Sequence, residues 1–256
     1  MFDFPFRRAL ITGASAGIGE RFAHVLGQAG VLCVVVARRE DRLRDLADRY
    51  AGFEVLEADL QTDADVAAVV ARIASNSDPV DLLVNNAGFG SSGPFHEVGV
   101  ERVTGQVDLN VKALVALTHG AVNAFRSRGG GHVLNVSSVA SFLASPNMAV
   151  YAATKSFVTS FTEAVHEENR KSGVRVSALC PGFVATEFQS VSGGADRVSR
   201  TPRALWLDAD KVVRAGLHGV VKNRAIVVPG WQYATMPVMS KLTPRFALRR
   251  MAGKIL

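Results

Sequence analysis

One tyrosine and one lysine stand at a spacing suited to proton transfer. Tyr151 and Lys155 are four residues apart in a stretch, 150–171, that reads as a helix, so both side chains face the same side. A phenol titrates near ~10 in water, too high for an efficient base at neutral pH, and a nearby ammonium favours the phenolate. Lowering the pKa of the phenol by about 2 to 3 units requires about 3 to 4 kcal/mol of differential interaction. The pair therefore predicts an acid–base centre at Tyr151.

A serine completes the chemistry that this pair can perform. Ser138 directly follows an apolar stretch, 132–137, that predicts a buried strand. Its hydroxyl can donate a hydrogen bond to a substrate oxygen and stabilise developing negative charge. Singly, Tyr151 can be read as a half-buried helix aromatic, Ser138 as a loop cap and Asn110 as a polar helix residue. Their occurrence together, in this order, favours a reactive site.

A glycine-rich turn lies between a predicted strand, 8–12, and a predicted helix, 18–28. Its spacing is G-x3-G-x-G, which differs from the general G-x-G-x-x-G dinucleotide fingerprint. Glycines let the backbone approach a pyrophosphate, and the helix start directs free N–H groups and its positive dipole end at that anion. The residues that we expect to contact a dinucleotide here are Thr12, Gly13, Ser15, Gly17, Ile18 and Gly19.

Two arginines at the end of the second predicted strand, 31–37, bear on the choice of dinucleotide. An NAD site needs an acidic residue at this strand end for the ribose 2′-hydroxyl, but Arg38 and Arg39 stand there and Glu40 already lies in the next helix. Cations at a helix N-terminus interact unfavourably with the helix dipole, so a different role must explain the two arginines at this position. A guanidinium can bind a 2′-phosphate bidentately, and we therefore predict NADP(H).

Strands and helices alternate along the whole chain. The other predicted strands are 54–57, 81–85, 132–137, 174–179 and 225–228, and the other predicted helices are 39–50, 63–75, 103–126, 150–171 and 208–221. Continuous apolar strands separated by helices predict a parallel sheet covered on both faces. We expect a doubly wound, Rossmann-like α/β fold that forms a single domain, 1–256, with its ligand site at the carboxyl ends of the strands.

Composition narrows the classes of protein further. The 256 residues are 48% hydrophobic and 20% charged, which excludes global disorder. The longest apolar run, 31–37, has seven residues, whereas a membrane span needs about 20. The N-terminal positive charge follows the apolar residues, the reverse of a secretory signal. Cys33 and Cys180 sit in apolar segments and read as core residues, so we expect a cytoplasmic location.

Two segments near the C-terminus stand apart from this pattern. Residues 187–206 have no strong period, and we interpret them as a substrate lid. Residues 229–256 form a basic, apolar extension: 211–256 contains nine Lys and Arg and no acid, whereas the first 210 residues carry a net charge of −3. Contact with a membrane surface is one reading; covering a pocket or a subunit interface is favoured. We expect no nucleic-acid partner and, from the spacing of the six histidines, no metal site.

The ordered set of motifs resembles the short-chain dehydrogenases/reductases of the compact, single-domain branch. The resemblance covers nearly the whole chain. It rests on the turn 12–19, Asp59-Leu60, Asn85-Asn86-Ala87-Gly88, Asn110, Ser138, Tyr151-x3-Lys155, and Pro181-Gly182 with Thr186.

The resemblance implies a role for each of these residues. Ser138, Tyr151 and Lys155 would perform the chemistry, and Asn110 would hold a water that relays protons. Lys155 would also bind the nicotinamide ribose. The remaining residues expected to contact the cofactor are Asp59, Leu60, Asn86, Ala87, Gly88, Tyr151, Pro181, Gly182, Val184 and Thr186. Many relatives pair through the helices that hold Asn110 and Tyr151, so a homodimer or homotetramer is expected.

The function that follows is an NADP(H)-dependent oxidoreductase that interconverts a ketone or aldehyde and an alcohol. An apolar substrate, such as a keto-acyl, steroid-like or aromatic carbonyl compound, is expected because aromatic residues follow several strand ends: Phe89, Phe142, Phe183, Phe188 and Trp206. The alternative is a catalytically silent dinucleotide-binding sensor or scaffold that acts through a partner or a membrane surface. The intact set of four residues argues against it.

Overall fold

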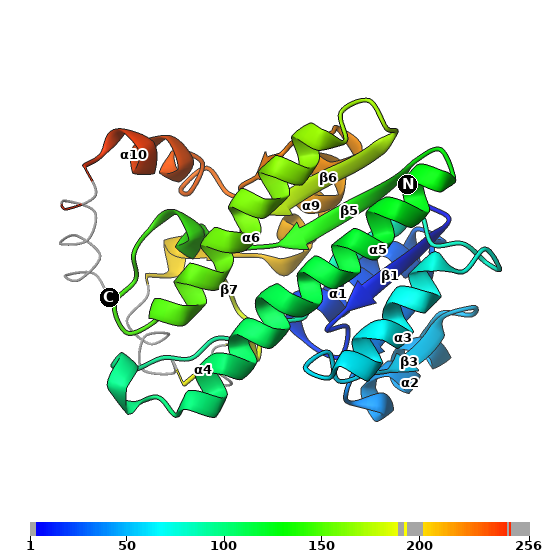
Figure 1. The fold of residues 1–256 in the computed structure, drawn as a ribbon, viewed down its shortest axis with the longest axis horizontal. Helices are drawn as coiled ribbons and strands as arrows, with labels where there is room; N and C mark the ends of the chain where they lie inside the picture. Colours follow the sequence, from blue (N-terminus) through cyan, green and yellow to red (C-terminus); the bar gives the residue numbers. More distant parts are fainter. Residues whose placement is uncertain (1–3, 189–191, 194–201, 245, 247–256) are drawn as a thin grey trace.

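A seven-stranded sheet forms the centre of the computed structural model, which describes residues 4–188, 192–193, 202–244 and 246 (Figure 1). The strand order is β3-β2-β1-β4-β5-β6-β9, and every pairing among the described strands is parallel. The strands are β1 (Arg8–Thr12), β2 (Leu32–Ala37), β3 (Glu54–Glu57), β4 (Leu82–Asn85), β5 (Gly131–Val136), β6 (Val174–Leu179) and β9 (Ile226–Val227). The chain reverses its direction of winding between β1 and β4, which places the ligand crevice beyond the carboxyl ends of these two strands.

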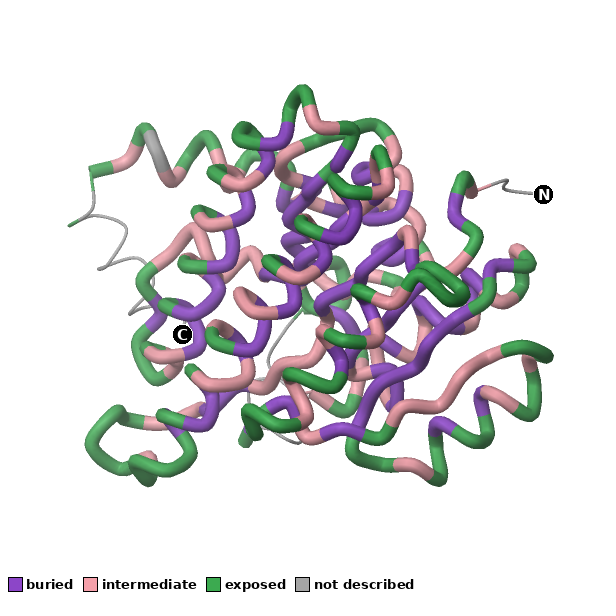
Figure 2. The backbone as a smooth tube through the Cα atoms, turned by 45° about the vertical axis from the view of Figure 1, so that its right-hand side comes forward, coloured by how far each residue is buried: buried purple, intermediate pink, exposed green. Residues whose placement is uncertain are grey.

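Helices cover both faces of the sheet. One apolar core lies under α1 (Gly17–Gln28), α2 (Glu40–Arg49) and α9 (Ala209–Val221). The other lies under α3 (Asp63–Ala74) and α5 (Leu114–Ser127), with α6 (Ala149–Glu168) packed against β6 on the same side. The tube view shows the strands as the buried centre and the loops as the exposed rim (Figure 2). The predicted doubly wound α/β fold is confirmed.

The predicted helix 103–126 is interrupted in the structure. It consists of α4 (Val100–Val107), a π-helical segment η2 (Asp108–Ala113) and α5. Widening the helix by one residue per turn changes the direction in which side chains leave it, and such segments occur often at functional sites. Asn110 lies in this segment, so the break sets the direction of its side chain.

Several short elements were not predicted, because they have too few residues to show the apolar periodicity of a helix or strand. They are η1 (Phe95–Glu97), η3 (Val139–Phe142), η4 (Arg203–Leu205), the paired strands β7 (Phe183–Val184) and β8 (Trp206–Leu207), and α10 (Met236–Leu242). Of the predicted lid, 187–206, residues 189–191 and 194–201 lie outside the described residues. Its C-terminal end is β8, where Trp206 pairs with Phe183 of β7.

The C-terminal extension leaves the body of the molecule at α10 (Figure 1). Large apolar side chains are exposed around it: Trp231, Val238, Met239, Leu242 and Phe246. Residues 245 and 247–256 of the predicted extension, 229–256, lie outside the described residues. Among the helices that the structure describes, none has the length and apolar character needed to cross a bilayer.

Candidate active site

The turn after β1 is shaped to receive a dinucleotide. Gly13 and Gly17 have φ values of +67° and +61°, a region that favours glycine. A Cβ on Gly13 would lie 2.8 Å from Nδ2 of Asn86, and one on Gly19 would overlap the carbonyl of Gly13. The residue that precedes α1, Ala16, gives the helix no side-chain cap. The first N–H groups of α1 are therefore left to a ligand, as a pyrophosphate requires.

Thr12 joins this turn to the loop after β4. Its Oγ1 accepts hydrogen bonds from the backbone N–H groups of Asn86 and Ala87, both at 3.0 Å. The Nδ2 of Asn86 donates to the carbonyl oxygen of Thr12 at 2.9 Å. The side chain of Asn86 thus fastens the two strand ends at the switch point.

The loop after β7 forms the opposite wall of the crevice. A Cβ on Gly17 would lie 3.1 Å from Cβ of Thr186, so glycine keeps the crevice open between the turn and this loop. Val184 is buried, and Pro181 accepts a hydrogen bond from the backbone N–H of Val139 at 2.9 Å. Gly182 lies where a Cβ would overlap the ring of Tyr233. Thr186 therefore faces the glycine turn, whereas Val184 and Gly182 pack into the protein beside it.

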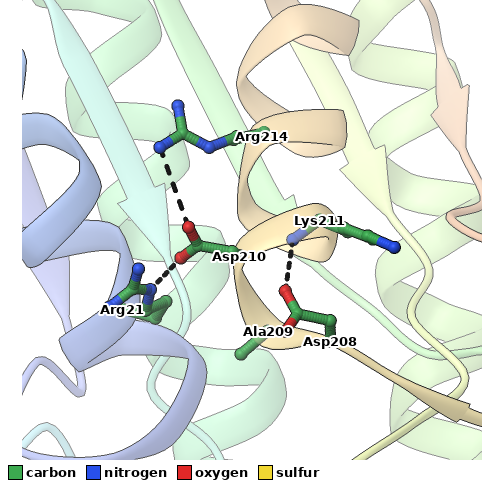
Figure 3. Close-up of a pocket in the computed structure, with 6 residues that line it drawn as sticks. All are labelled: Arg21, Asp208, Ala209, Asp210, Lys211 and Arg214. Carbon is green, nitrogen blue, oxygen red and sulfur yellow. Dashed lines mark hydrogen bonds and ion pairs between the residues drawn. The ribbon is translucent and has the colours of Figure 1, made fainter.

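Charged residues of α1 and of the start of α9 line a pocket and pair with one another. Asp210 of α9 lies between Arg21 of α1, with which it forms a hydrogen-bonded ion pair, and Arg214, whose Nη2 is 3.7 Å from Oδ2 of Asp210 (Figure 3). The Arg21 guanidinium holds the pKa of the Asp210 carboxyl below its ordinary value. Asp208 caps α9 by accepting from the N–H of Lys211 at 3.1 Å. The Arg21–Asp210 pair joins α1, which begins in the glycine turn, to α9.

The arginines after β2 reach two different partners. Nη1 of Arg38 lies 3.8 Å from Oδ2 of Asp59. Nε and Nη2 of Arg39 each lie 3.2 Å from Oγ of Ser15 in the glycine turn. Arg42, which the sequence analysis did not single out, donates to Glu187 at 2.8 Å. Its position three residues after Arg39 on a predicted helix was the available signal.

Tyr151 and Lys155 lie one helical turn apart on α6, as predicted, and both are buried. The Nζ of Lys155 is 5.9 Å from the centre of the Tyr151 ring. It donates a hydrogen bond to the carbonyl oxygen of Val136, at the end of β5, at 2.8 Å. The lysine is therefore held at the carboxyl edge of the sheet.

Burial, rather than the Lys155 ammonium, has the largest effect on the pKa of the Tyr151 hydroxyl in this structure. It raises the pKa of Tyr151 to about 12, against a hydrogen bond with Ser138 that acts in the opposite direction. Burial also lowers the pKa of Lys155 to about 8. The expectation of a phenol acidified by its lysine is not met here, because both groups are removed from water and the charged form of each is disfavoured.

Ser138 and Asn110 complete the predicted set of four. Ser138 follows β5, and its Oγ accepts from the N–H of Ala140 at 3.1 Å. Asn110 donates from Nδ2 to the carbonyl oxygen of Phe89 at 3.0 Å, and its Oδ1 accepts from the N–H of Phe89 at 3.1 Å. Nδ2 also lies 3.1 Å from Oγ1 of Thr154 on α6. Asn110 thus links the loop after β4 to the helix that carries Tyr151.

The space between these residues is tightly filled. A Cβ on Gly88 would lie 2.8 Å from Oδ1 of Asn110 and 3.6 Å from Nζ of Lys155.

Of the predicted aromatic residues, Phe188 has its ring centre 5.4 Å from that of Tyr151. Phe183 packs on Trp206, with ring centres 5.8 Å apart. Leu60 of the predicted set, which follows Asp59 in sequence, is buried.

Comparisons with known proteins agree with this geometry. Residues 7–195 match the family model described as short chain dehydrogenase. An uncharacterized oxidoreductase of Myxococcus xanthus is 32% identical over 95% of both chains. A short-chain dehydrogenase from Sphingobium yanoikuyae, solved in complex with NADPH, is 32% identical, covers 91% of this chain and 92% of its own, and superimposes with a TM-score of 0.82.

A second solved structure carries the other dinucleotide. The short chain dehydrogenase/reductase from Burkholderia phymatum in complex with NAD is 26% identical over 94% of both chains, with a TM-score of 0.80. The fold is thus shared by proteins with either cofactor. The chain belongs to the short-chain dehydrogenase/reductase family and is an oxidoreductase of that family.

Proposed function

We propose that the chain is an NADP(H)-dependent oxidoreductase that interconverts a ketone or aldehyde and an alcohol. The observation that carries the proposal is the buried Tyr151–Lys155 pair, with Ser138 beside the phenol, at the carboxyl edge of the sheet next to the glycine turn. In reduction the carbonyl carbon gains a hydride and the carbonyl oxygen gains a proton. A bound reduced nicotinamide supplies the hydride, and the protein supplies the proton.

Tyr151 supplies that proton in our proposal. A phenol with a pKa of about 12 is protonated at neutral pH, which suits donation to the oxygen of a carbonyl undergoing reduction. Ser138 would donate a hydrogen bond to the same oxygen and stabilise its developing charge. The Lys155 ammonium would stabilise the phenolate that remains after proton transfer. Asn110 would hold the loop after β4 in place against α6. It would also bind the water through which a proton returns from solvent to the site.

The choice of NADP(H) rests on the cationic end of the crevice. Arg39 bonds to the glycine turn at Ser15, and Arg38 lies beside Asp59. No acidic residue stands at the end of β2, where an NAD site requires one. Asp59 would contact the adenine, and Val184 and Thr186 would hold the nicotinamide carboxamide.

We further propose an apolar carbonyl substrate. Phe188 packs on Tyr151, and Phe142 belongs to η3, which directly follows Ser138, so an apolar wall stands beside the reacting groups. Residues 1–256 are proposed to act as a single cytoplasmic domain. A homodimer or homotetramer would form through the helices that hold Asn110 and Tyr151.

A panel of apolar ketones and their alcohols, assayed with NADPH and NADH, tests the proposal. We expect ketone reduction with NADPH and the reverse oxidation with NADP⁺. Absence of turnover across the panel, in protein that binds the dinucleotide, would instead favour a binding protein that senses or presents the dinucleotide.

Replacing Arg38 with Ala tests the choice of cofactor. Loss of a charged partner of the 2′-phosphate is expected to weaken NADPH about tenfold or more, while NADH, which lacks that phosphate, changes little. The dissociation constants can be measured from the fluorescence of the reduced dinucleotides. An equal loss for NADPH and NADH would contradict the assignment.

A further inference from the structure

A carboxylate from the loop after β7 reaches two arginines at the start of α2. Oε2 of Glu187 lies 3.1 Å from Nη1 of Arg39, and Oε1 lies 2.8 Å from Nη1 of Arg42. Arg39 also bonds to Oγ of Ser15. Glu187 belongs to the loop after β7 and is almost 150 residues distant in sequence, so this contact spans the crevice between the glycine turn and that loop.

The arrangement has the form of an anion site that is already filled. Two guanidiniums converge on two oxygens of one anionic group, with a serine hydroxyl beside them. Carboxylate and phosphate are both bound by arginine through paired N–H donors, and the same donors cannot serve both fully. The two arginines hold the pKa of the Glu187 carboxyl below its ordinary value, so it is ionised at neutral pH.

We infer that Glu187 is a specificity-determining residue that occupies the guanidiniums of Arg39 and Arg42, which a 2′-phosphate bound near Arg38 would otherwise also engage, and so reduces the preference for NADPH over NADH. The inference rests on the proposed function, since it assumes that the dinucleotide lies between the turn and the loop. NADH has no group that competes for Arg39 and Arg42, and it leaves Glu187 in place. A 2′-phosphate must displace the carboxylate or accept its repulsion.

Glu187 also stands between two residues of the predicted site. Its neighbour Thr186 accepts a hydrogen bond from the N–H of Phe188 at 3.3 Å, and Phe188 packs on Tyr151. Glu187 is therefore one residue away from the ring that packs on the phenol.

Glu187→Gln tests the inference because it keeps the shape of the side chain and removes its charge. The probes are 2′,5′-ADP, which carries the 2′-phosphate, and 5′-AMP, which does not, with binding measured by calorimetry. We expect the variant to bind 2′,5′-ADP about fivefold more tightly, the size of an exposed ion pair, and 5′-AMP unchanged. NADPH should gain over NADH by the same ratio.

Glu40→Gln is the matched control. Glu40 lies on α2, is similarly exposed, and pairs with Arg44 at 2.6 Å. We expect no change in the ratio of the two affinities for this variant. An equal gain in both variants would show a general effect of charge and overturn the inference.

A double-mutant cycle shows whether Glu187 acts through Arg42. In an Arg42→Ala background the gain from Glu187→Gln should shrink, because one of the two competing contacts is already absent. Unchanged or weaker binding of 2′,5′-ADP by Glu187→Gln would overturn the inference; weaker binding would instead identify Glu187 as a clasp over the cofactor. The probes need no catalysis, so failure of the proposed reaction would be visible separately, as absent turnover by the wild-type protein.

Discussion

Replacing Tyr151 with Phe should reduce turnover about 10² to 10⁴-fold, the range for loss of a positioned acid or base, and leave dinucleotide binding intact. The substitution removes only the hydroxyl, and the ring keeps its packing against Phe188. Initial rates of ketone reduction, together with fluorescence titration of NADPH, separate the two effects. The phenyl ring of the variant has no hydroxyl that needs a hydrogen bond with Ser138 in the buried site, so the fold should be retained.

Tyr50→Phe is the control for this substitution. Its hydroxyl also makes one hydrogen bond, to Nδ1 of His24 at 3.0 Å, but at the C-terminal end of α2. We expect near wild-type rates for this variant. Full activity of Tyr151→Phe would remove the phenol from the mechanism and with it the proposed reaction.

Replacing Lys155 with Met should abolish most turnover, by about 10²-fold or more, and also change how stability depends on pH. Burial lowers the pKa of Lys155 to about 8 from its ordinary value of 10.5. The folded protein therefore binds fewer protons than the unfolded chain between these two values, and stability rises with pH across this window. Below pH 8 the buried ammonium costs on the order of 3 kcal/mol, offset in part by its hydrogen bond to Val136.

Urea unfolding at pH 7 and near pH 10 measures this dependence. The free energy of unfolding of Lys155→Met, relative to wild type, should fall by up to about 3 kcal/mol between the two values, because only wild type gains stability there. Lys112→Met is the control, since Lys112 is exposed and paired with Asp63 at 2.6 Å. If the difference in unfolding free energy between Lys155→Met and wild type does not change with pH, burial does not lower the pKa of Lys155 in the folded protein.

Local patterns were sufficient to predict the sheet and the helix that carries Tyr151 and Lys155, whereas the reactivity of Ser138, Asn110 and this pair stays a prediction. Most strands have enough apolar residues to show their burial, and Tyr151 and Lys155 lie on one helix whose geometry fixes their spacing. The same reasoning predicted the side on which they would meet, because parallel strands present their carboxyl ends at one edge.

Tertiary contacts explain what could not be predicted. The contact of Glu187 with Arg39 and Arg42 joins segments almost 150 residues apart, and no local pattern reports it. The raised pKa of Tyr151 depends on how completely other segments bury the phenol. The π-helical segment at Asn110 has six residues, too few to change the apolar periodicity of the helical stretch around it, so the sequence does not reveal it.

Transfer of deuterium from labelled NADPH to a ketone tests the central claim most directly. With an apolar ketone and NADPH that carries deuterium at its transferable position, wild-type protein should yield an alcohol labelled on the carbinol carbon, as detected by mass spectrometry. Tyr151→Phe should yield almost none while still binding the dinucleotide. If wild-type protein binds NADPH but labels no alcohol from any carbonyl compound in the panel, the assignment of hydride transfer with Tyr151 as the proton donor is contradicted.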